Sequence, residues 1–177
     1  MILPIRTYGD SVLRRKAKPV EVFDDELRRL ADNMAETMYR APGVGLAAPQ
    51  VGVGLRLIVV DVSHDEVRDQ LHKIANPEVL EVSEESERCE EGCLSVPGFS
   101  EAVVRPHWAK FRGQDMEGKP FILEAEGLLA RCILHEIDHL NGILFVDRLA
   151  PFRRKLLRQR LKKQFGTLSA PEFQPTR

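Results

Sequence analysis

The sequence predicts an α+β fold in a single domain. The chain has 177 residues, of which 43% are hydrophobic, so it is long enough to form one domain with a sizeable core. Helical patterns occur towards both ends, and short β-rich segments lie between them without the strand–helix alternation of a parallel sheet. We therefore expect one domain over residues 1–177, with short antiparallel or mixed strands packed around a central helix. An N-terminal helix and a basic C-terminal helix and tail, at 150–177, should complete it.

Residues 24–40 are predicted to form the first helix. Apolar side chains recur there with helical spacing, and Asp24 or Asp25 is a suitable N-cap. A glycine-rich loop at 43–54 follows, and the β-branched residues at 57–62 then predict a buried strand. The apolar face of the helix consists of Leu27, Leu30, Ala31, Met34 and Met38.

The middle of the chain favours further strands. Residues 73–82 are predicted to be extended, with an interruption at the Asn-Pro pair at 76–77. Residues 108–112 and 120–125 flank a turn-forming sequence at 115–118, and this arrangement predicts an antiparallel hairpin.

Two further helices are predicted after this hairpin. Residues 126–140 carry apolar side chains on most of the helical circumference, which indicates a largely buried helix, and Gly142 suits a left-handed helix end. Residues 151–165 predict a basic helix, because no acidic residue occurs from position 148 to position 170. The apolar residues available for its packing are Phe152, Leu156, Leu157 and Leu161.

Charge and composition exclude several classes of protein. The 26 basic and 27 acidic residues give a net charge of −1, so the chain as a whole has no general attraction to nucleic acid. The sequence has no apolar run of membrane-spanning length and no apolar signal segment near its start. Three cysteines, an odd number, argue against a disulfide framework. We expect a soluble, cytoplasmic protein.

The predicted central helix contains the most informative motif of the chain, His-Glu-Ile-Asp-His at 135–139. Residues four apart share one helical face, so the imidazoles of His135 and His139 can bind the same metal ion. The carboxylate of Glu136 can then reach a water on that ion. This pattern predicts a metal-dependent hydrolase, and the alternative is that both histidines are merely buried core residues.

A catalytic metal site normally has three protein ligands, so the two histidines need a partner. The long metallopeptidase pattern requires a third histidine where this chain has Phe145, and phenylalanine cannot bind a metal ion. The later acids, Asp147 and Glu172, are not predicted to face inward from a helix. Upstream, Cys93 follows a glycine and precedes a stiff Val-Pro pair. A thiolate is a good metal ligand, although a lone cysteine is more often a small buried apolar residue.

Three segments, taken together, resemble the peptide deformylase family. They are GVGLAAPQ at 43–50, EGCLS at 91–95 and HEIDH at 135–139, and they occur in the order and spacing of that family. The opening segment GDSVLR at 9–14 is also similar, so the resemblance covers residues 5–149.

The resemblance implies an enzyme that removes the formyl group from the N-terminal formylmethionine of newly made peptides and releases formate. A metal-bound hydroxide would attack the formyl carbonyl. The resemblance implies that the metal ligands are Cys93, His135 and His139. It implies that Glu136 is the general acid/base and that Gly45 contacts the substrate. It also implies that the side chain of Gln50 and the backbone N–H of Leu94 stabilise the oxyanion.

The resemblance also implies a methionine pocket and a cofactor. Val44, Leu128 and Cys132 are the candidate pocket residues, although Cys132 would serve equally well in the core. Arg131 is expected either to line the mouth of the pocket or to extend into solvent. One sulfur and two nitrogen ligands favour zinc on chemical grounds, whereas the resemblance implies Fe²⁺, with nickel or cobalt as substitutes.

Two alternative functions and one partner remain open. An endopeptidase is disfavoured by Phe145 and by the small size of the chain. A metal-stabilised RNA-binding module would not need the spare carboxylate of Glu136. The basic helix is interpreted first as a solvated face, and alternatively as a contact to ribosomal RNA near the peptide exit. No membrane partner is expected, and formylmethionine initiation points to a bacterial-type cytoplasm.

Overall fold

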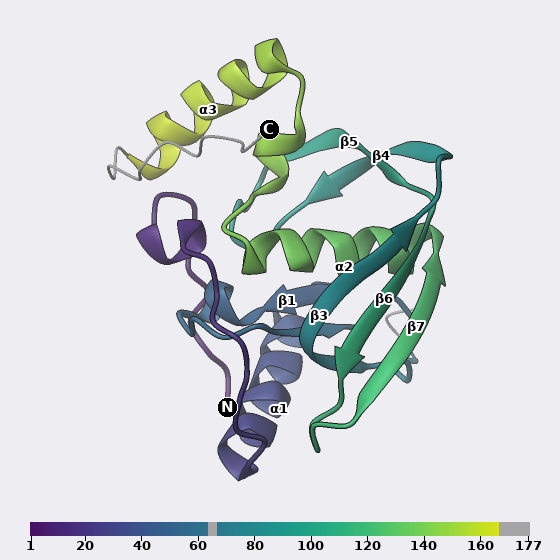
Figure 1. Ribbon diagram of the computed structural model, residues 1–177. Coiled ribbons are helices and arrows are strands. Elements are labelled where there is room, and N and C mark those ends of the chain that lie inside the picture. Colours follow the sequence, from purple (N-terminus) through teal and green to yellow (C-terminus); the bar gives the residue numbers. More distant parts are fainter. Residues whose placement is uncertain (64–66, 167–177) are drawn as a thin grey trace.

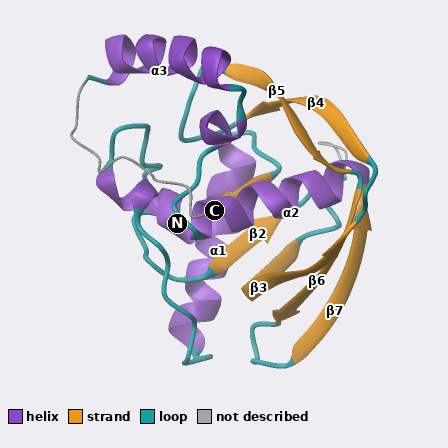
Figure 2. Ribbon diagram, turned by 45° about the horizontal axis from the view of Figure 1, so that its top comes forward, coloured by secondary structure: helices purple, strands orange, loops and turns teal. Residues whose placement is uncertain are grey.

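The computed structural model describes residues 1–63 and 67–166 and has a helix, α2 (Gly127–Leu140), at its centre (Figure 1). A five-stranded sheet lies on one side of α2 and a two-stranded hairpin lies on the other (Figure 2). All neighbouring strands are antiparallel. The predicted α+β fold with a central helix and antiparallel strands is therefore confirmed.

The first predicted helix is confirmed as α1 (Asp25–Arg40). Asp24 is its N-cap, and its side chain accepts a hydrogen bond of 3.0 Å from the backbone N–H of Leu27. The region 43–54 is more structured than the predicted loop. It contains a short strand, β1 (Gly45–Ala47), followed by a 3₁₀ turn, η2 (Ala48–Val51).

The larger sheet has the strand order β1-β2-β3-β6-β7, which makes β1 an edge strand. The predicted interruption of the second extended segment is confirmed as a shift of register between Ala75 and Glu78. Asn76 has a φ of 49° there, and its side-chain amide donates hydrogen bonds to Val20 and Gln114. The remaining strands of this sheet are β2 (Leu57–Val60), β3 (His72–Val82), β6 (Trp108–Gln114) and β7 (Pro120–Glu126).

The smaller sheet was not predicted. It is a hairpin of β4 (Ser86–Gly92) and β5 (Ser100–Pro106). Strand β4 has the sequence SERCEEG, and Glu91 is its only fully buried residue. Because the strand is charged and mostly exposed, it lacks the alternating apolar pattern by which a strand is recognised.

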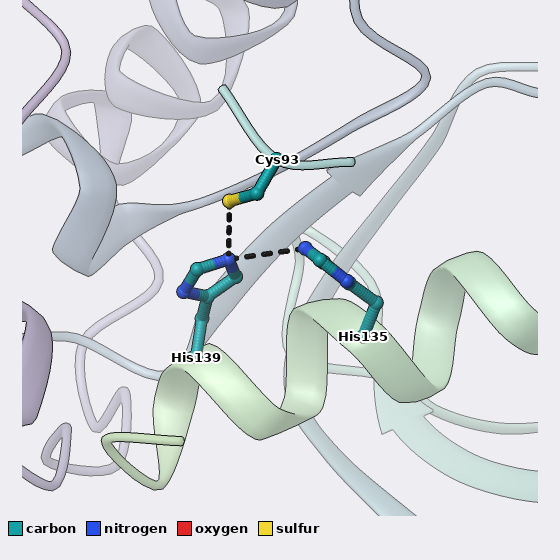
Figure 3. A group of neighbouring side chains, drawn as sticks. All are labelled: Cys93, His135 and His139. Carbon is teal, nitrogen blue, oxygen red and sulfur yellow. Dashed lines mark hydrogen bonds between the residues drawn. The ribbon is translucent and has the colours of Figure 1, made fainter. Parts of the chain in front are cut away.

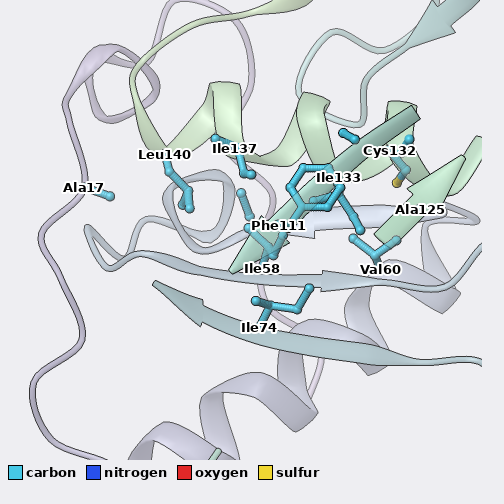
Figure 4. Packing of buried hydrophobic residues seen from close by; sticks show 13 residues of the cluster. Ala17, Ile58, Val60, Ile74, Phe111, Ala125, Cys132, Ile133, Ile137 and Leu140 are labelled. Carbon is cyan, nitrogen blue, oxygen red and sulfur yellow. The ribbon is translucent and has the colours of Figure 1, made fainter. Parts of the chain in front are cut away.

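Strand β2 divides the core into two layers. Ile58 and Val60 pack towards α2 (Figure 4), whereas Leu57 and Val59 pack with the buried face of α1. All four side chains have no exposed surface. Burial of side chains of this size contributes about 1.5–3 kcal/mol each, so the two layers hold α2 firmly against the sheet.

The C-terminal part follows the predicted pattern with one exception. Gly142, just after α2, has a φ of 74°, and a Cβ there would lie 2.5 Å from the carbonyl oxygen of Arg14. The predicted basic helix is α3 (Pro151–Phe165), whose buried residues are Leu157 and Leu161. The packing predicted for the other two apolar residues is wrong, because Phe152 and Leu156 are exposed at 73% and 44%. Two further 3₁₀ turns are η1 (Ser11–Arg14) and η3 (Phe145–Arg148).

None of the helices in the described ranges has both the length and the apolar character needed to cross a membrane.

Candidate metal centre

Three potential metal ligands meet between α2 and the end of β4 (Figure 3). The ligand atoms of Cys93, His135 and His139 all lie within 4.8 Å of one another. The Nε2 atom of His139 is 3.2 Å from the sulfur of Cys93 and 3.2 Å from Nε2 of His135. Metal–nitrogen and metal–sulfur bonds of about 2.0 and 2.3 Å place tetrahedral ligands roughly 3.3–3.6 Å apart. The spacing of these atoms therefore fits a transition-metal ion.

The fold explains why these three side chains face each other. His135 and His139 are one turn apart on α2, and Cys93 directly follows β4, which lies alongside that helix. Both histidines are buried, and Cys93 is partly exposed. One side of the cluster therefore remains open to a cleft.

The ring of His135 is oriented by Glu91. Its Nδ1 lies 2.6 Å from Oε1 of Glu91, and this hydrogen bond leaves Nε2 pointing at the cluster. Burial alone would raise the pKa of Glu91, but hydrogen bonds from Arg105 and His135 bring that pKa well below its usual range. The carboxylate is therefore ionised and can only accept hydrogen bonds.

Glu136 lies beside the cluster and is 3% exposed. Burial raises the pKa of Glu136 to about 7, although the neighbouring His135 opposes this shift. Within the described part of the chain, its Oε2 atom has no hydrogen-bond partner. A buried carboxyl group with a pKa near neutrality is suited to accept a proton and then give it up.

The raised pKa predicts a pH-dependent effect on stability. The ordinary pKa of the carboxyl group is 4.5, so the folded protein binds this proton more tightly than the unfolded chain does. Ionised Glu136 then lowers the free energy of unfolding as pH rises from about 4.5 to about 7. In the presence of a chelator, Glu136→Gln should therefore be more stable than wild type at about pH 8, by at most about 3 kcal/mol. Urea unfolding measures this difference, and a gain as large at about pH 5 would contradict it.

The pKa of His139 is shifted in the opposite direction to that of Glu136. Burial lowers the pKa of His139 well below its usual range, and the neighbouring His135 lowers it further. The imidazole of His139 is therefore neutral, which is the form that binds a metal ion.

A cleft of about 710 Å³ opens beside the cluster. Nine of the ten site residues predicted from the sequence line it, and the tenth, His139, lies behind them at 1% exposure. The nine lining residues are Val44, Gly45, Gln50, Cys93, Leu94, Leu128, Cys132, His135 and Glu136.

Gln50 has a fixed orientation in this cleft. It is 1% exposed, and its Oε1 accepts a hydrogen bond of 2.9 Å from the backbone N–H of Ala47. Its Nε2 lies 3.1 Å from Oγ of Ser95 and 3.5 Å from the sulfur of Cys93. The amide N–H groups are therefore directed towards the metal cluster.

Gly45 allows β1 to approach α2 closely. A Cβ at this position would lie 2.4 Å from Oε1 of Glu136 and 2.7 Å from the sulfur of Cys132. Only a residue without a side chain fits between the strand and these two groups.

Comparison with known proteins identifies the family of this chain. The family model described as polypeptide deformylase matches residues 2–155. The chain belongs to the peptide deformylase family. It is therefore an enzyme, as the resemblance predicted.

Relatives in sequence and in structure agree with this assignment. The peptide deformylase of Azotobacter vinelandii is 53% identical over 163 residues, which cover 92% of this chain and 96% of the relative. The crystal structure of a peptide deformylase from Legionella pneumophila has a TM-score of 0.85 and 48% identity, and the match covers 93% of this chain and 96% of that one. The crystal structure of the peptide deformylase from Thermus thermophilus also has a TM-score of 0.85, at 45% identity. This match covers 93% of this chain and 99% of that one.

One expectation about a charged residue of this deformylase is wrong, and another is decided between its two alternatives. Arg131 does not extend into solvent, because it is 6% exposed and its guanidinium contacts Glu91. It lines the cleft instead, as the other alternative expected. Asp147, which was not expected to face inward, has a side chain that is only 3% exposed. It forms an ion pair with Arg14 and lies outside the ligand cluster.

Sequence reasoning assigned no role to Glu91 or Arg105. Glu91 stands in a strand whose other residues are mostly exposed, and its partners lie 14 to 44 positions further along the chain. One signal was present, because Glu91 belongs to the EGCLS segment that carries the family resemblance.

Proposed function

We propose that this enzyme hydrolyses the N-formyl group of formylmethionyl peptides with a divalent metal ion held by Cys93, His135 and His139. Membership of the peptide deformylase family supports the reaction. The observation that carries the metal-dependent mechanism is the meeting of the three ligand atoms beside Glu136, a buried carboxyl group whose pKa is about 7. The ion we infer is Fe²⁺, as in the family resemblance, with zinc, nickel and cobalt as alternatives.

In this mechanism Glu136 moves the proton. A divalent ion in the site would supply a Lewis acid that makes water a better nucleophile. Glu136 accepts a proton from the water that attacks the formyl carbon, and it then donates this proton to the departing amine nitrogen. The carbon–nitrogen bond breaks, and the products are formate and a peptide with a free N-terminal amine.

The oxyanion that forms on the formyl group needs fixed hydrogen-bond donors. We assign this role to the side-chain amide of Gln50 and to the backbone N–H of Leu94, which directly follows Cys93. The hydrogen bond from Ala47 to Oε1 of Gln50 supports this assignment, because it turns the Nε2 group towards the metal cluster before substrate arrives.

The rest of the cleft would bind the peptide. Strand β1 is an edge strand, so the backbone at Gly45 can pair with an extended peptide as an added strand. Val44 and Leu128 are exposed at 40% and 56%, and Cys132 is buried at 6% exposure, with its sulfur 3.4 Å from the carbonyl oxygen of Val44. These three side chains form the apolar surface that we assign to the methionine side chain of the substrate.

Formate release from formyl-Met-Ala-Ser tests the proposal. Protein purified without oxygen and supplied with iron, nickel or cobalt should release one formate for each peptide, and a chelator should stop the reaction. No release with any of these metals would refute the proposed function. Cleavage at internal peptide bonds without formate release would favour the endopeptidase alternative.

Gly45→Ala is expected to reduce kcat/KM for this peptide by about 10²-fold, because the new Cβ must displace Glu136 or Cys132. Gly54→Ala is the matched control, since a Cβ at position 54 meets no atom within 4 Å. Steady-state kinetics of both variants measure the difference. Equal activity of the two variants would show that the close approach of β1 to α2 is not required.

Helix α3 is a candidate contact to ribosomal RNA. A second hollow, of about 720 Å³, runs along α3 beside Glu101, and four of its eight lining residues are basic. Lys155, Arg160 and Lys163 are exposed on this helix. We expect co-sedimentation with ribosomes to weaken steeply between about 50 and 200 mM salt, and replacement of these three residues by glutamate to abolish it. Unchanged sedimentation of the triple variant would leave α3 as a solvated face only. An enzyme bound to the ribosome through α3 would act in the cytoplasm, where new chains emerge.

A further inference from the structure

The metal ligands of the proposed site come from two separate parts of the fold. His135 and His139 belong to α2, whereas Cys93 lies in the connection between β4 and β5, which form a sheet of their own (Figure 1). Within residues 1–63 and 67–166, no strand ladder joins this hairpin to the five-stranded sheet that supports α2. The distance between the thiolate and the two imidazoles therefore depends on side chains that connect the hairpin to the helix.

Arg131 is the side chain of α2 that makes the most extensive connection. Its Nη1 donates hydrogen bonds of 2.9 Å to the carbonyl oxygen of Val103 and 3.0 Å to Oε2 of Glu91. Its Nη2 donates a hydrogen bond of 2.7 Å to the carbonyl oxygen of Glu87. One guanidinium from α2 thus binds both strands of the hairpin, at two positions on β4 and one on β5.

The position of Arg131 links these contacts to the metal ligands. It lies one helical turn before His135, and its side chain is 8% exposed. Glu91, which it contacts, stands two residues before Cys93 and accepts the hydrogen bond from His135. Arg131 therefore contacts the carboxylate that orients His135, and it contacts β4, the strand that directly precedes Cys93.

Arg105 also binds Glu91 but holds it in a different way. Its Nε and Nη2 lie 2.8 and 2.7 Å from the two carboxylate oxygens. Because Arg105 is on β5 and Glu91 is on β4, this pair lies within the hairpin. The link from Arg105 to α2 is its contact of 3.0 Å with Asp138. The hydrogen bond between His135 and Glu91 is a second link, and Arg131 supplies a third, which also contacts the hairpin backbone.

We propose that Arg131 is a positioning residue that sets the spacing of the metal ligands by joining α2 to the β4–β5 hairpin. This inference rests on the proposed metal site. Without the guanidinium, two carbonyl oxygens of the hairpin each lose one donor, and among the described residues Glu91 keeps only Arg105 and His135 as side-chain partners. The hairpin can then move relative to α2, and Cys93 moves with it. Changes of this kind around a metal site typically weaken metal binding by about 10–100-fold.

Cobalt binding tests the proposal without measuring catalysis. We expect Arg131→Met to weaken Co²⁺ binding by about 10–100-fold in competition with a chelator, and to change the absorption bands of the bound Co²⁺. Arg131→Lys keeps one charged donor and should bind Co²⁺ with intermediate affinity. It also serves as the second variant if Arg131→Met does not fold.

Arg148→Met is the matched control. Arg148 binds the same helix through both oxygens of Asp138, at 2.6 and 3.0 Å. Arg148 lies on η3, outside the hairpin, and without it Asp138 keeps its contact with Arg105. Its loss should therefore lower thermal stability but leave Co²⁺ affinity within about threefold of wild type. Equal Co²⁺ affinities and spectra for Arg131→Met and Arg148→Met would overturn the proposal. So would an Arg131→Met protein that differs from wild type only in KM.

The outcomes separate this inference from the proposed function. Wild-type protein that binds Co²⁺ but releases no formate would refute the deformylase mechanism, and the Arg131 comparison would stand. Wild-type protein that does not bind Co²⁺ would refute the metal site and the positioning role together.

Discussion

Glu136→Gln is expected to reduce kcat/KM for formyl-Met-Ala-Ser by about 10²–10⁴-fold. Glutamine has nearly the same shape as glutamate but cannot accept a proton from water or donate one to the departing amine. The side chain is buried against the strand that we assign to substrate binding, so no solvent carboxylate can easily replace it. Formate release by samples of equal metal content measures this loss.

Glu90→Gln is the control for this experiment. Glu90 lines the same cleft, but it is exposed on β4. Removal of its charge should change kcat/KM by less than about threefold. A Glu136→Gln enzyme that keeps its metal and more than a tenth of its activity would show that another group moves the proton.

The pH dependence of activity should reflect the same group. Glu136 acts first as a base, so kcat/KM should fall as pH falls through its pKa. That pKa is about 7 when burial and the surrounding residues alone determine it, and a nearby divalent cation favours the ionised form. In the metal-loaded enzyme, the fall of kcat/KM on the acid side is therefore expected below pH 7.

The elements that sequence reasoning found are those with a strong local signal. Helix α1 has an aspartate cap and one apolar face, and α3 begins at Pro151 and ends before Gly166. Spacing along the chain is also sufficient to pair His135 with His139, because an α-helix places residues four apart on one face.

The elements it missed depend on pairing with another segment and not on their own local pattern. Strand β4 is charged and mostly exposed, so its sequence does not alternate between apolar and polar residues, although it pairs with β5. Strand β1 has three residues inside a glycine-rich segment. Short or polar segments of this kind form strands because a neighbour supplies hydrogen bonds, and that neighbour cannot be found from local pattern.

The same reason accounts for the charged residues inside the protein. Arg131 stands in an apolar helix, and its charge left two interpretations open, a place at the mouth of the pocket and extension into solvent. Its partner Glu91 lies 40 positions away, and only the fold shows that the two are neighbours. The metal ligands were predicted more completely than these charged residues. The family resemblance implied Cys93, which helical spacing alone could not identify.

Cys93→Ala is expected to release the metal ion and to lower kcat/KM by at least about 10³-fold, the loss that corresponds to several kcal/mol of charge stabilisation. Cys93 is the one ligand of this three-residue cluster that α2 does not supply, as found among the residues that the structure describes. Two imidazoles four residues apart bind a metal ion weakly without a third group. Metal content after dialysis and formate release together measure the effect. Cys89→Ala is the control, because Cys89 is exposed on β4, four residues before Cys93, and should keep both metal and activity. Loss of metal from Cys89→Ala as well would mean that the variants act through the hairpin fold, whereas an active, metal-bound Cys93→Ala enzyme would exclude the thiolate as a ligand.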